Sequence, residues 1–182
     1  MTPRVISVSG PPGAGKSTLA ASLASALGAT FVEYDDYEVI TSWPPERVIG
    51  WLDDGAPFDQ VIAPGLFEAL SQIDGKIVLE TPFGRCCPAT GHLIDFSVWL
   101  DCPADLALAR KLSVLAENAQ QDSQFSAMLS GWLAAYQSFT RRALILQDEN
   151  VKPTADIMVP AADPAETVLS SVLSALNPRH SP

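Results

Sequence analysis

The stretch Gly10-Pro11-Pro12-Gly13-Ala14-Gly15-Lys16-Ser17 matches the pattern G-x-x-x-x-G-K-[ST]. The apolar run 5–9 before it is typical of a buried strand, and leucines at helical spacing predict a helix over 16–27. Glycines let the backbone turn tightly and aim its N–H groups at phosphate oxygens, and the start of a helix adds the positive end of its dipole. Strand, loop and helix together therefore predict a phosphate-binding loop.

The loop predicts a nucleotide and a magnesium ion as ligands. We expect Lys16 to contact the β- and γ-phosphates as a catalytic charge and the Ser17 hydroxyl to be a ligand of Mg²⁺. ATP is the expected nucleotide, because neither N-K-x-D nor D-x-x-G of GTPases is present, although nothing excludes GTP. The residues expected to bind the nucleotide are Gly10, Pro12, Gly13, Ala14, Gly15, Lys16, Ser17 and Thr18.

Length and composition predict one globular domain over residues 1–182, with 47% hydrophobic and 18% charged residues. The formal net charge of −10 would repel a nucleic-acid backbone, so we expect no nucleic-acid partner. No apolar run reaches the length of a membrane span and no secretory signal is visible, so we expect no membrane partner and a cytoplasmic location. The adjacent Cys86 and Cys87 form neither a disulfide framework nor a zinc pattern.

Apolar runs of strand length alternate with helical patterns, which favours an α/β fold with a parallel sheet. The strands are expected at 5–9, 30–34, 76–80, 96–101 and 155–159. The helices are expected at 16–27, 45–53, 67–73, 103–115, 125–146 and 166–176, with a polar connector over 117–124. The segment 41–65 is rich in Pro, Trp and Gly, and we expect it to be an insertion that shapes an acceptor pocket and not part of the core.

Asp35 follows the second expected strand, at the carboxyl edge of a parallel sheet where ligands bind in open α/β folds. A carboxylate there can orient an acceptor hydroxyl and take its proton. The alternative is that Asp35 or its neighbour Asp36 caps the next helix, and the sequence favours Asp35 as the base. Tyr37 in the same turn is expected to bind the acceptor.

Further charged residues follow the later strands. Glu80 ends the third strand at the same edge and is expected to hold the Mg²⁺ shell or to bind the acceptor. Arg85 is expected to bind the acceptor, with a structural salt bridge as an equal alternative. Arg110 and Lys111, on the helix after the fourth strand, suit a lid that neutralises charge on the transferred phosphoryl group.

Four stretches carry a resemblance to the uridine kinase–phosphoribulokinase branch of P-loop kinases. They are 10–18, the turn 34–37, the strand and helix over 98–111, and the late stretch 152–160. The resemblance implies a three-layer α/β/α P-loop NTPase fold with a central, mainly parallel five-stranded sheet.

The resemblance also implies that Asp35 activates the acceptor, that Glu80 is the acidic residue closing strand three, and that Arg110 is a catalytic lid arginine. Two departures stand out, since uridine kinases generally follow that glutamate with Gly and carry further lid arginines. Here Thr81–Arg85 and Ser113–Ala116 occupy those places, so the acceptor need not be uridine.

The sequence thus predicts an ATP-dependent kinase that transfers the γ-phosphate of Mg-ATP to a hydroxyl of a nucleoside, sugar or similar metabolite. One alternative is a nucleoside-monophosphate-type kinase, which would require several arginines around the acceptor. Another is a regulatory P-loop ATPase without a small-molecule acceptor. The sequence leaves open whether the protein is a monomer or a homodimer.

Overall fold

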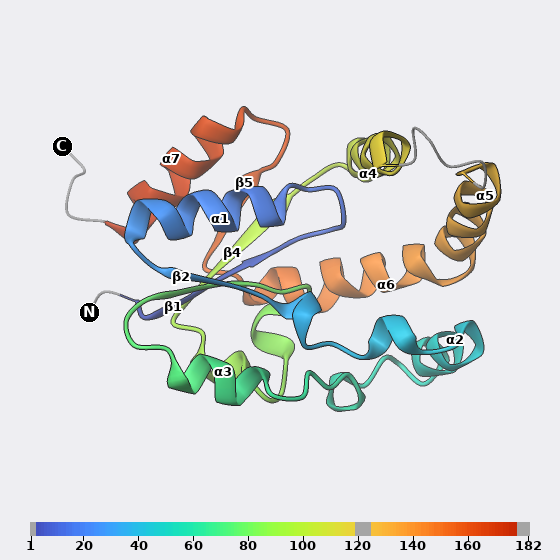
Figure 1. Cartoon of the computed structure of the whole chain (residues 1–182), viewed down its shortest axis with the longest axis horizontal. Helices are drawn as coiled ribbons and strands as arrows, with labels where there is room; N and C mark the ends of the chain where they lie inside the picture. Colours follow the sequence, from blue (N-terminus) through green and yellow to red (C-terminus); the bar gives the residue numbers. More distant parts are fainter. Residues whose placement is uncertain (1–2, 119–124, 178–182) are drawn as a thin grey trace.

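The computed structural model describes residues 3–118 and 125–177, and within them the chain forms a five-stranded, wholly parallel sheet (Figure 1). The strands are β1 (Val5–Ser9), β2 (Thr30–Glu33), β3 (Ile77–Glu80), β4 (Phe96–Asp101) and β5 (Ile157–Pro160). Their order across the sheet is β2-β3-β1-β4-β5, so the strand that precedes the phosphate-binding loop lies in the centre. The predicted parallel sheet is confirmed.

Helices cover both faces of the sheet and make three layers. The helices are α1 (Lys16–Leu27), α2 (Pro45–Asp53), α3 (Leu66–Gln72), α4 (Ala104–Asn118), α5 (Phe125–Ala135), α6 (Arg141–Leu146) and α7 (Ala165–Leu176). Helices α1 and α7 pack on one face, α2, α3 and α6 lie on the other, and α4 and α5 stand beyond the end of the sheet (Figure 1). The carboxyl edge of the sheet therefore lies near the start of α4, which follows β4 directly.

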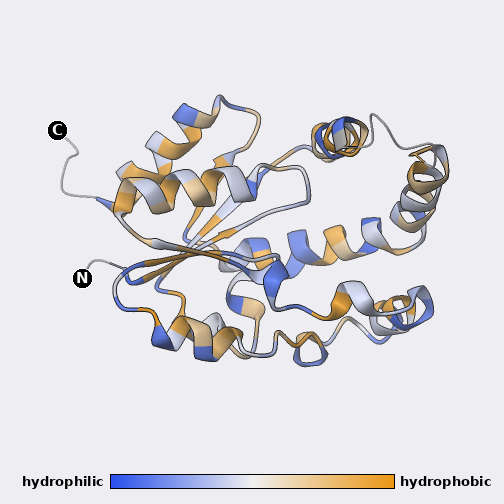
Figure 2. Ribbon diagram, in the orientation of Figure 1, coloured by the Kyte–Doolittle hydropathy of each residue, from blue (hydrophilic) through white to orange (hydrophobic). Residues whose placement is uncertain are grey.

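Strand residues alternate between two apolar cores, because successive side chains of a strand point to opposite faces. Ile6, Val8 and Val78 join an aliphatic core under α1 and α7. Ile77 and Leu79 join a second core that also contains several aromatic side chains, which we call the aromatic core. Both faces of the central strands are buried, as the runs of apolar residues in them require, and Figure 2 shows these strands in hydrophobic colours.

The expectation that segment 41–65 lies outside the core is wrong. The aromatic core contains four buried residues of this segment, Trp43, Val48, Trp51 and Leu52. The rings of Trp43 and Trp51 pack edge to face, with their centroids 6.4 Å apart. The spacing of 48, 51 and 52 gives α2 an apolar face, and the indole Nε1 of Trp51 donates to the carbonyl of Pro57 at 3.0 Å. The Pro and Gly residues interrupt the regular structure of this segment, but its tryptophan side chains are still buried.

The element boundaries differ slightly from those predicted. The second strand ends at Glu33, since Tyr34–Asp36 form a 3-10 turn. The helix predicted over 125–146 is interrupted by a π-helical turn at Tyr136–Thr140 before it continues as α6. Most of the connector predicted over 117–124 lies outside the described residues. In the described part of the chain, no helix has both the length and the apolar character needed to cross a bilayer.

Replacing Trp51 by Ala tests whether the 41–65 segment belongs to the core. We expect Trp51→Ala to lower the free energy of unfolding by about 3–5 kcal/mol, because it removes a buried aromatic side chain and leaves a cavity. Ile62→Ala is the control in the same segment, since Ile62 is 54% exposed, and should change stability by roughly 0.5 kcal/mol or less. Urea unfolding followed by tryptophan fluorescence measures both, and equal effects would place the segment outside the core.

Candidate nucleotide and acceptor site

The phosphate-binding loop joins the end of β1 to the start of α1. Gly13 has a φ of +88°, and a Cβ at that position would lie 2.1 Å from the carbonyl oxygen of Ala107 on α4. A Cβ at Gly10 would lie 2.8 Å from the carbonyl oxygen of Leu100 at the end of β4. These two glycines are therefore required by close approach of backbone as well as by conformation. The loop is held against β4 and α4.

Glu80 lies beside the start of α1 and is only 7% exposed. Its Oε1 is 3.5 Å from Nζ of Lys16, and its Oε2 accepts a hydrogen bond from the Ser17 hydroxyl at 3.0 Å. Lys16 Nζ also donates to the carbonyl of Pro11 at 3.4 Å, across the loop. The contact with Glu80 follows from topology, since β3 pairs with β1 and Glu80 stands level with Val8.

The same oxygens suit a magnesium ion. Mg²⁺ prefers hard oxygen ligands and is usually held by one or two protein groups together with water and substrate phosphates. Ser17 and Glu80 offer a hydroxyl and a carboxylate side by side at the mouth of the loop. No cluster of three or more His, Cys, Asp or Glu side chains among the described residues could hold a metal by itself. The residues therefore fit a magnesium ion that a nucleotide brings.

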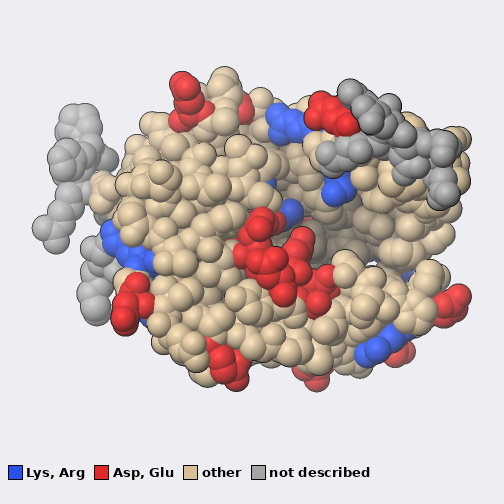
Figure 3. Space-filling model, viewed as in Figure 1, with Lys and Arg blue, Asp and Glu red and all other residues tan. Residues whose placement is uncertain are grey.

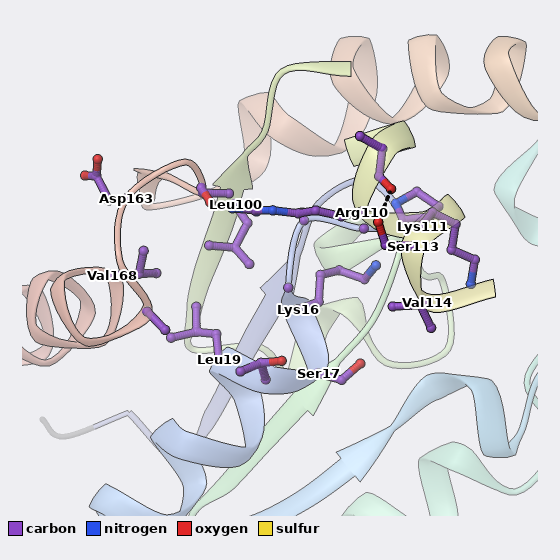
Figure 4. Close-up of a pocket in the computed structure, with 18 of the residues that line it drawn as sticks. Lys16, Ser17, Leu19, Leu100, Arg110, Lys111, Ser113, Val114, Asp163 and Val168 are labelled. Carbon is purple, nitrogen blue, oxygen red and sulfur yellow. Dashed lines mark hydrogen bonds between the residues drawn. The ribbon is translucent and has the colours of Figure 1, made fainter. Parts of the chain in front are cut away.

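A cavity of about 720 Å³ lies over the phosphate-binding loop (Figure 4). That volume is within the range of small-molecule sites. Its wall comes from three places: the loop with α1, the helix α4, and the chain after β5. The lining residues of that last part are Ala161, Asp163, Ala165 and Val168, which the sequence analysis missed. Their position after a strand at the carboxyl edge was the signal that could have found them.

Arg110 and Lys111 both line this cavity from α4. The Nη1 of Arg110 donates to the carbonyl oxygen of Ala161 at 2.8 Å, so the side chain connects α4 to the chain after β5 above Lys16 (Figure 4). The geometry brings these two cations to the phosphate-binding loop.

Asp35 lies in the 3-10 turn after β2, at the same edge of the sheet. Burial and the nearby Glu80 carboxylate raise the pKa of Asp35, while Lys16 and Lys111 act in the opposite direction. Asp35 is therefore within electrostatic reach of the groups around the phosphate-binding loop. Tyr37, at the end of the turn, is half-buried against the aromatic core, so its position next to Asp35 is fixed by packing.

Arg85 does not lie at the phosphate-binding loop, and its expected role in binding the acceptor is not supported. Its guanidinium donates to the carbonyl oxygens of Ile94, Asp95 and Thr154 and to the carboxylate of Asp156. These acceptors precede β4 and β5, at the amino edge of the sheet, opposite the loop. The structural alternative for Arg85 is the one observed.

Comparisons with known proteins agree with this fold. The family model described as ATPase family associated with various cellular activities (AAA) matches residues 6–56, well under half of the chain. Among curated protein sequences none matches the chain. The fold is that of the P-loop NTPases, a three-layer α/β/α architecture with a parallel sheet.

Solved structures of small-molecule kinases share this fold. A shikimate kinase from Acinetobacter baumannii, in complex with shikimate, has a TM-score of 0.60 at 17% identity, covering 99% of this chain and 97% of that one. A gluconokinase from Sinorhizobium meliloti 1021 has a TM-score of 0.58 at 19% identity, covering 96% and 92%. A deoxyadenosine kinase from M. mycoides with bound dATP has a TM-score of 0.55 at 14% identity, covering 94% and 98%. At these identities the likeness shows the fold alone.

Replacing Arg85 by Met tests its structural assignment. We expect Arg85→Met to lower the free energy of unfolding by roughly 1–3 kcal/mol, because carbonyl oxygens lose a charged donor, and to leave nucleotide affinity unchanged. Arg142→Met is the matched control, since Arg142 pairs with Asp53 on the surface and should contribute roughly 0–1 kcal/mol. Chemical unfolding and nucleotide titration measure the two properties. A large loss of affinity with unchanged stability would return Arg85 to the site.

The effect of Arg85 on stability should depend on pH. Burial by itself would raise the pKa of Asp156, but the Arg85 guanidinium and the Ser97 N–H outweigh it and hold the pKa below its ordinary value. A carboxyl with a lowered pKa contributes stability above its unfolded pKa and loses it as the pH falls through the folded pKa. The difference between wild type and Arg85→Met should therefore be largest at neutral pH and shrink below about pH 4.

Proposed function

We propose that this protein is an ATP-dependent kinase that transfers the γ-phosphate to a hydroxyl of a small molecule. The observation that carries the proposal is the position of Asp35 in the turn after β2, at the carboxyl edge of the sheet, where the charges of Lys16, Lys111 and Glu80 act on its carboxylate. Phosphoryl transfer needs charge neutralisation and an oriented acceptor oxygen more than covalent help from the protein. The phosphate-binding loop would supply the charge neutralisation, and the carboxylate beside it would orient the acceptor oxygen.

On the donor side, the N–H groups of the loop and the Lys16 ammonium bind the phosphates. Ser17 and Glu80 hold the magnesium ion, which neutralises charge on the phosphates when bound. Arg110 closes over the cavity from α4 and, with Lys111, adds positive charge where the phosphoryl group transfers. The cavity over the loop and the position of all five side chains in or beside it support these roles.

On the acceptor side, Asp35 orients the hydroxyl and takes its proton, and Tyr37 lines the pocket. A general base works best when its pKa lies closer to the operating pH, and the raised pKa of Asp35 has that direction. Asp36 in the same turn is the alternative base. The resemblance to uridine kinases supports a nucleoside or sugar as the acceptor.

The other readings of the fold have less support. A nucleoside-monophosphate-type kinase requires arginines around the acceptor phosphate, and Arg85 is bonded at the opposite edge of the sheet. A regulatory ATPase also uses a polar or acidic side chain to orient water, so the dependence of ADP release on an acceptor is what separates it from a kinase. The solved kinases that share this fold are consistent with phosphoryl transfer by this protein. The acceptors of those kinases do not identify the acceptor here.

Release of ADP tests the proposal. Purified protein with Mg-ATP and a panel of sugars, nucleosides and amino alcohols should release ADP well above background only when its acceptor is present. Lys16→Ala is the control, because loss of the phosphate contact should abolish release with every acceptor. The same ADP release with and without each acceptor would contradict the kinase function and favour a regulatory ATPase.

Asp35→Asn tests the base. The amide keeps the size of the side chain and cannot take a proton, so we expect kcat to fall by roughly 10²–10⁴-fold while nucleotide still binds. Stopped assays for product and a titration with a fluorescent ATP analogue separate the two effects. If Asp36→Asn lost turnover while Asp35→Asn kept it, the base would be Asp36.

A further inference from the structure

Helix α5 and the π-helical turn Tyr136–Thr140 that continues it form one stretch, residues 125–140, which we call the helical arm. The arm contains no charged residue. All of it lies within the described part of the chain, and there none of its residues is buried, although Phe139 packs against the aromatic core. An uncharged helix with so little burial depends on a few contacts for its position.

One of these contacts is a narrow crevice between the arm, α4 and the phosphate-binding loop. Its volume is about 20 Å³, which is room for about one water molecule and too little for a ligand. The crevice is therefore a seam between packed elements. Its lining includes Trp132 and Tyr136 from the arm, Ala107 and Lys111 from α4, and Pro12 from the loop. The rings of Trp132 and Tyr136 stack, with their centroids 5.5 Å apart and 26° between their planes.

Lys111 borders both this crevice and the nucleotide cavity (Figure 4). Its side chain therefore forms part of the wall between the two spaces. The stem of a lysine commonly packs along apolar surface while its ammonium stays in a polar environment. Figure 3 shows basic side chains inside a hollow on this face of the molecule. The aromatic pair of the arm is thus placed to hold the stem of a cation whose charge serves the nucleotide.

The arm has no charge of its own, so it can act on bound phosphates only through another residue. Two residues border both spaces, Lys111 and Pro12. Proline has no N–H to donate to a phosphate, whereas lysine offers a full charge on a flexible stem. Ordering a free lysine side chain is costly, and packing that restricts the stem beforehand lowers that cost when a ligand binds.

We infer that Trp132 and Tyr136 are positioning residues that hold Lys111 toward the phosphates of the nucleotide. Coupling between two sites is reciprocal, so nucleotide binding also tightens the arm against α4. The inference needs a nucleotide at the phosphate-binding loop and does not involve the acceptor. Its tests therefore use nucleotide alone, and their failure is distinct from failure of the kinase function.

A double-mutant cycle with Lys111 tests the assignment. Trp132→Leu removes the stacked ring but keeps an apolar side chain, and it should raise the Kd of a fluorescent ATP analogue by roughly two- to fivefold. Trp132→Phe keeps a ring and should restore most of the affinity. Lys111→Met removes the charge and keeps the stem, and in that background Trp132→Leu should leave the Kd nearly unchanged. Met128→Ala is the control, because Met128 is 41% exposed on the same helix.

The outcomes of the cycle divide cleanly. An equal loss of affinity from Trp132→Leu with and without the Lys111 ammonium would mean that the arm acts through the loop at Pro12, and would overturn the inference. So would an unchanged Kd in Trp132→Leu, or a loss of the same size in Met128→Ala. Thermal unfolding midpoints establish which variants fold, and Tyr136→Leu repeats the cycle at the other ring if Trp132→Leu does not.

Hydrogen exchange tests the reciprocal effect. Mg-ATP should slow amide exchange over residues 125–140 of the wild type at least twofold, since the ligand favours the docked arm. In Lys111→Met, at nucleotide concentrations that saturate the site, this protection should be lost while protection of the phosphate-binding loop persists. Equal protection of the arm in both proteins, or none in the wild type, would overturn the coupling.

Discussion

The buried carboxylate of Glu80 is the constraint on which the site depends. An ion that is 7% exposed is costly unless it is paired and hydrogen-bonded, and its partners are the Lys16 ammonium and the Ser17 hydroxyl. Both partners belong to the start of α1, so the carboxylate fixes the helix against the end of β3. That pairing requires β3 to lie next to β1 with Glu80 level with Val8, which is the observed register. The central strands and the phosphate-binding loop are therefore positioned together.

A chain with a net charge of −10 has few cations to place, and their distribution is informative. Lys16, Arg110 and Lys111 gather around the nucleotide cavity, where a triphosphate needs them. The turn after β2, at the same edge of the sheet, carries carboxylates instead, among them the group proposed as the base. Burial and Glu80 raise the pKa of that base, and Lys16 and Lys111 lower it, so the cations that bind the donor also act on the base.

The sequence was enough to predict the strands, the loop and the residues that each strand delivers to the carboxyl edge, because these follow from local pattern and the rule of parallel sheets. Position in space was harder to predict. Nothing local to Arg85 shows that three carbonyl groups from two distant segments, one before β4 and one before β5, converge on its guanidinium. The chain after β5 was overlooked because Ala161 and its neighbours have small side chains without distinctive chemistry. Prolines and glycines in segment 41–65 suggested a loose insertion, although the spacing of Val48, Trp51 and Leu52 already indicated a buried helix face.

The burial of that segment bears directly on the site. The turn over residues 33–38 carries four carboxylates, and burial, followed by the neighbouring negative charges, raises the pKa values of Glu33 and Asp35. The turn is anchored by Tyr34, whose ring packs edge to face against that of Phe83 inside the aromatic core, with the ring centroids 5.5 Å apart. Trp51 packs in the same core, so α2 covers the anchor of the turn. Hydrophobic burial behind the turn thus offsets electrostatic repulsion in front of it, which is how carboxylates can be held together at the cleft before any ligand binds.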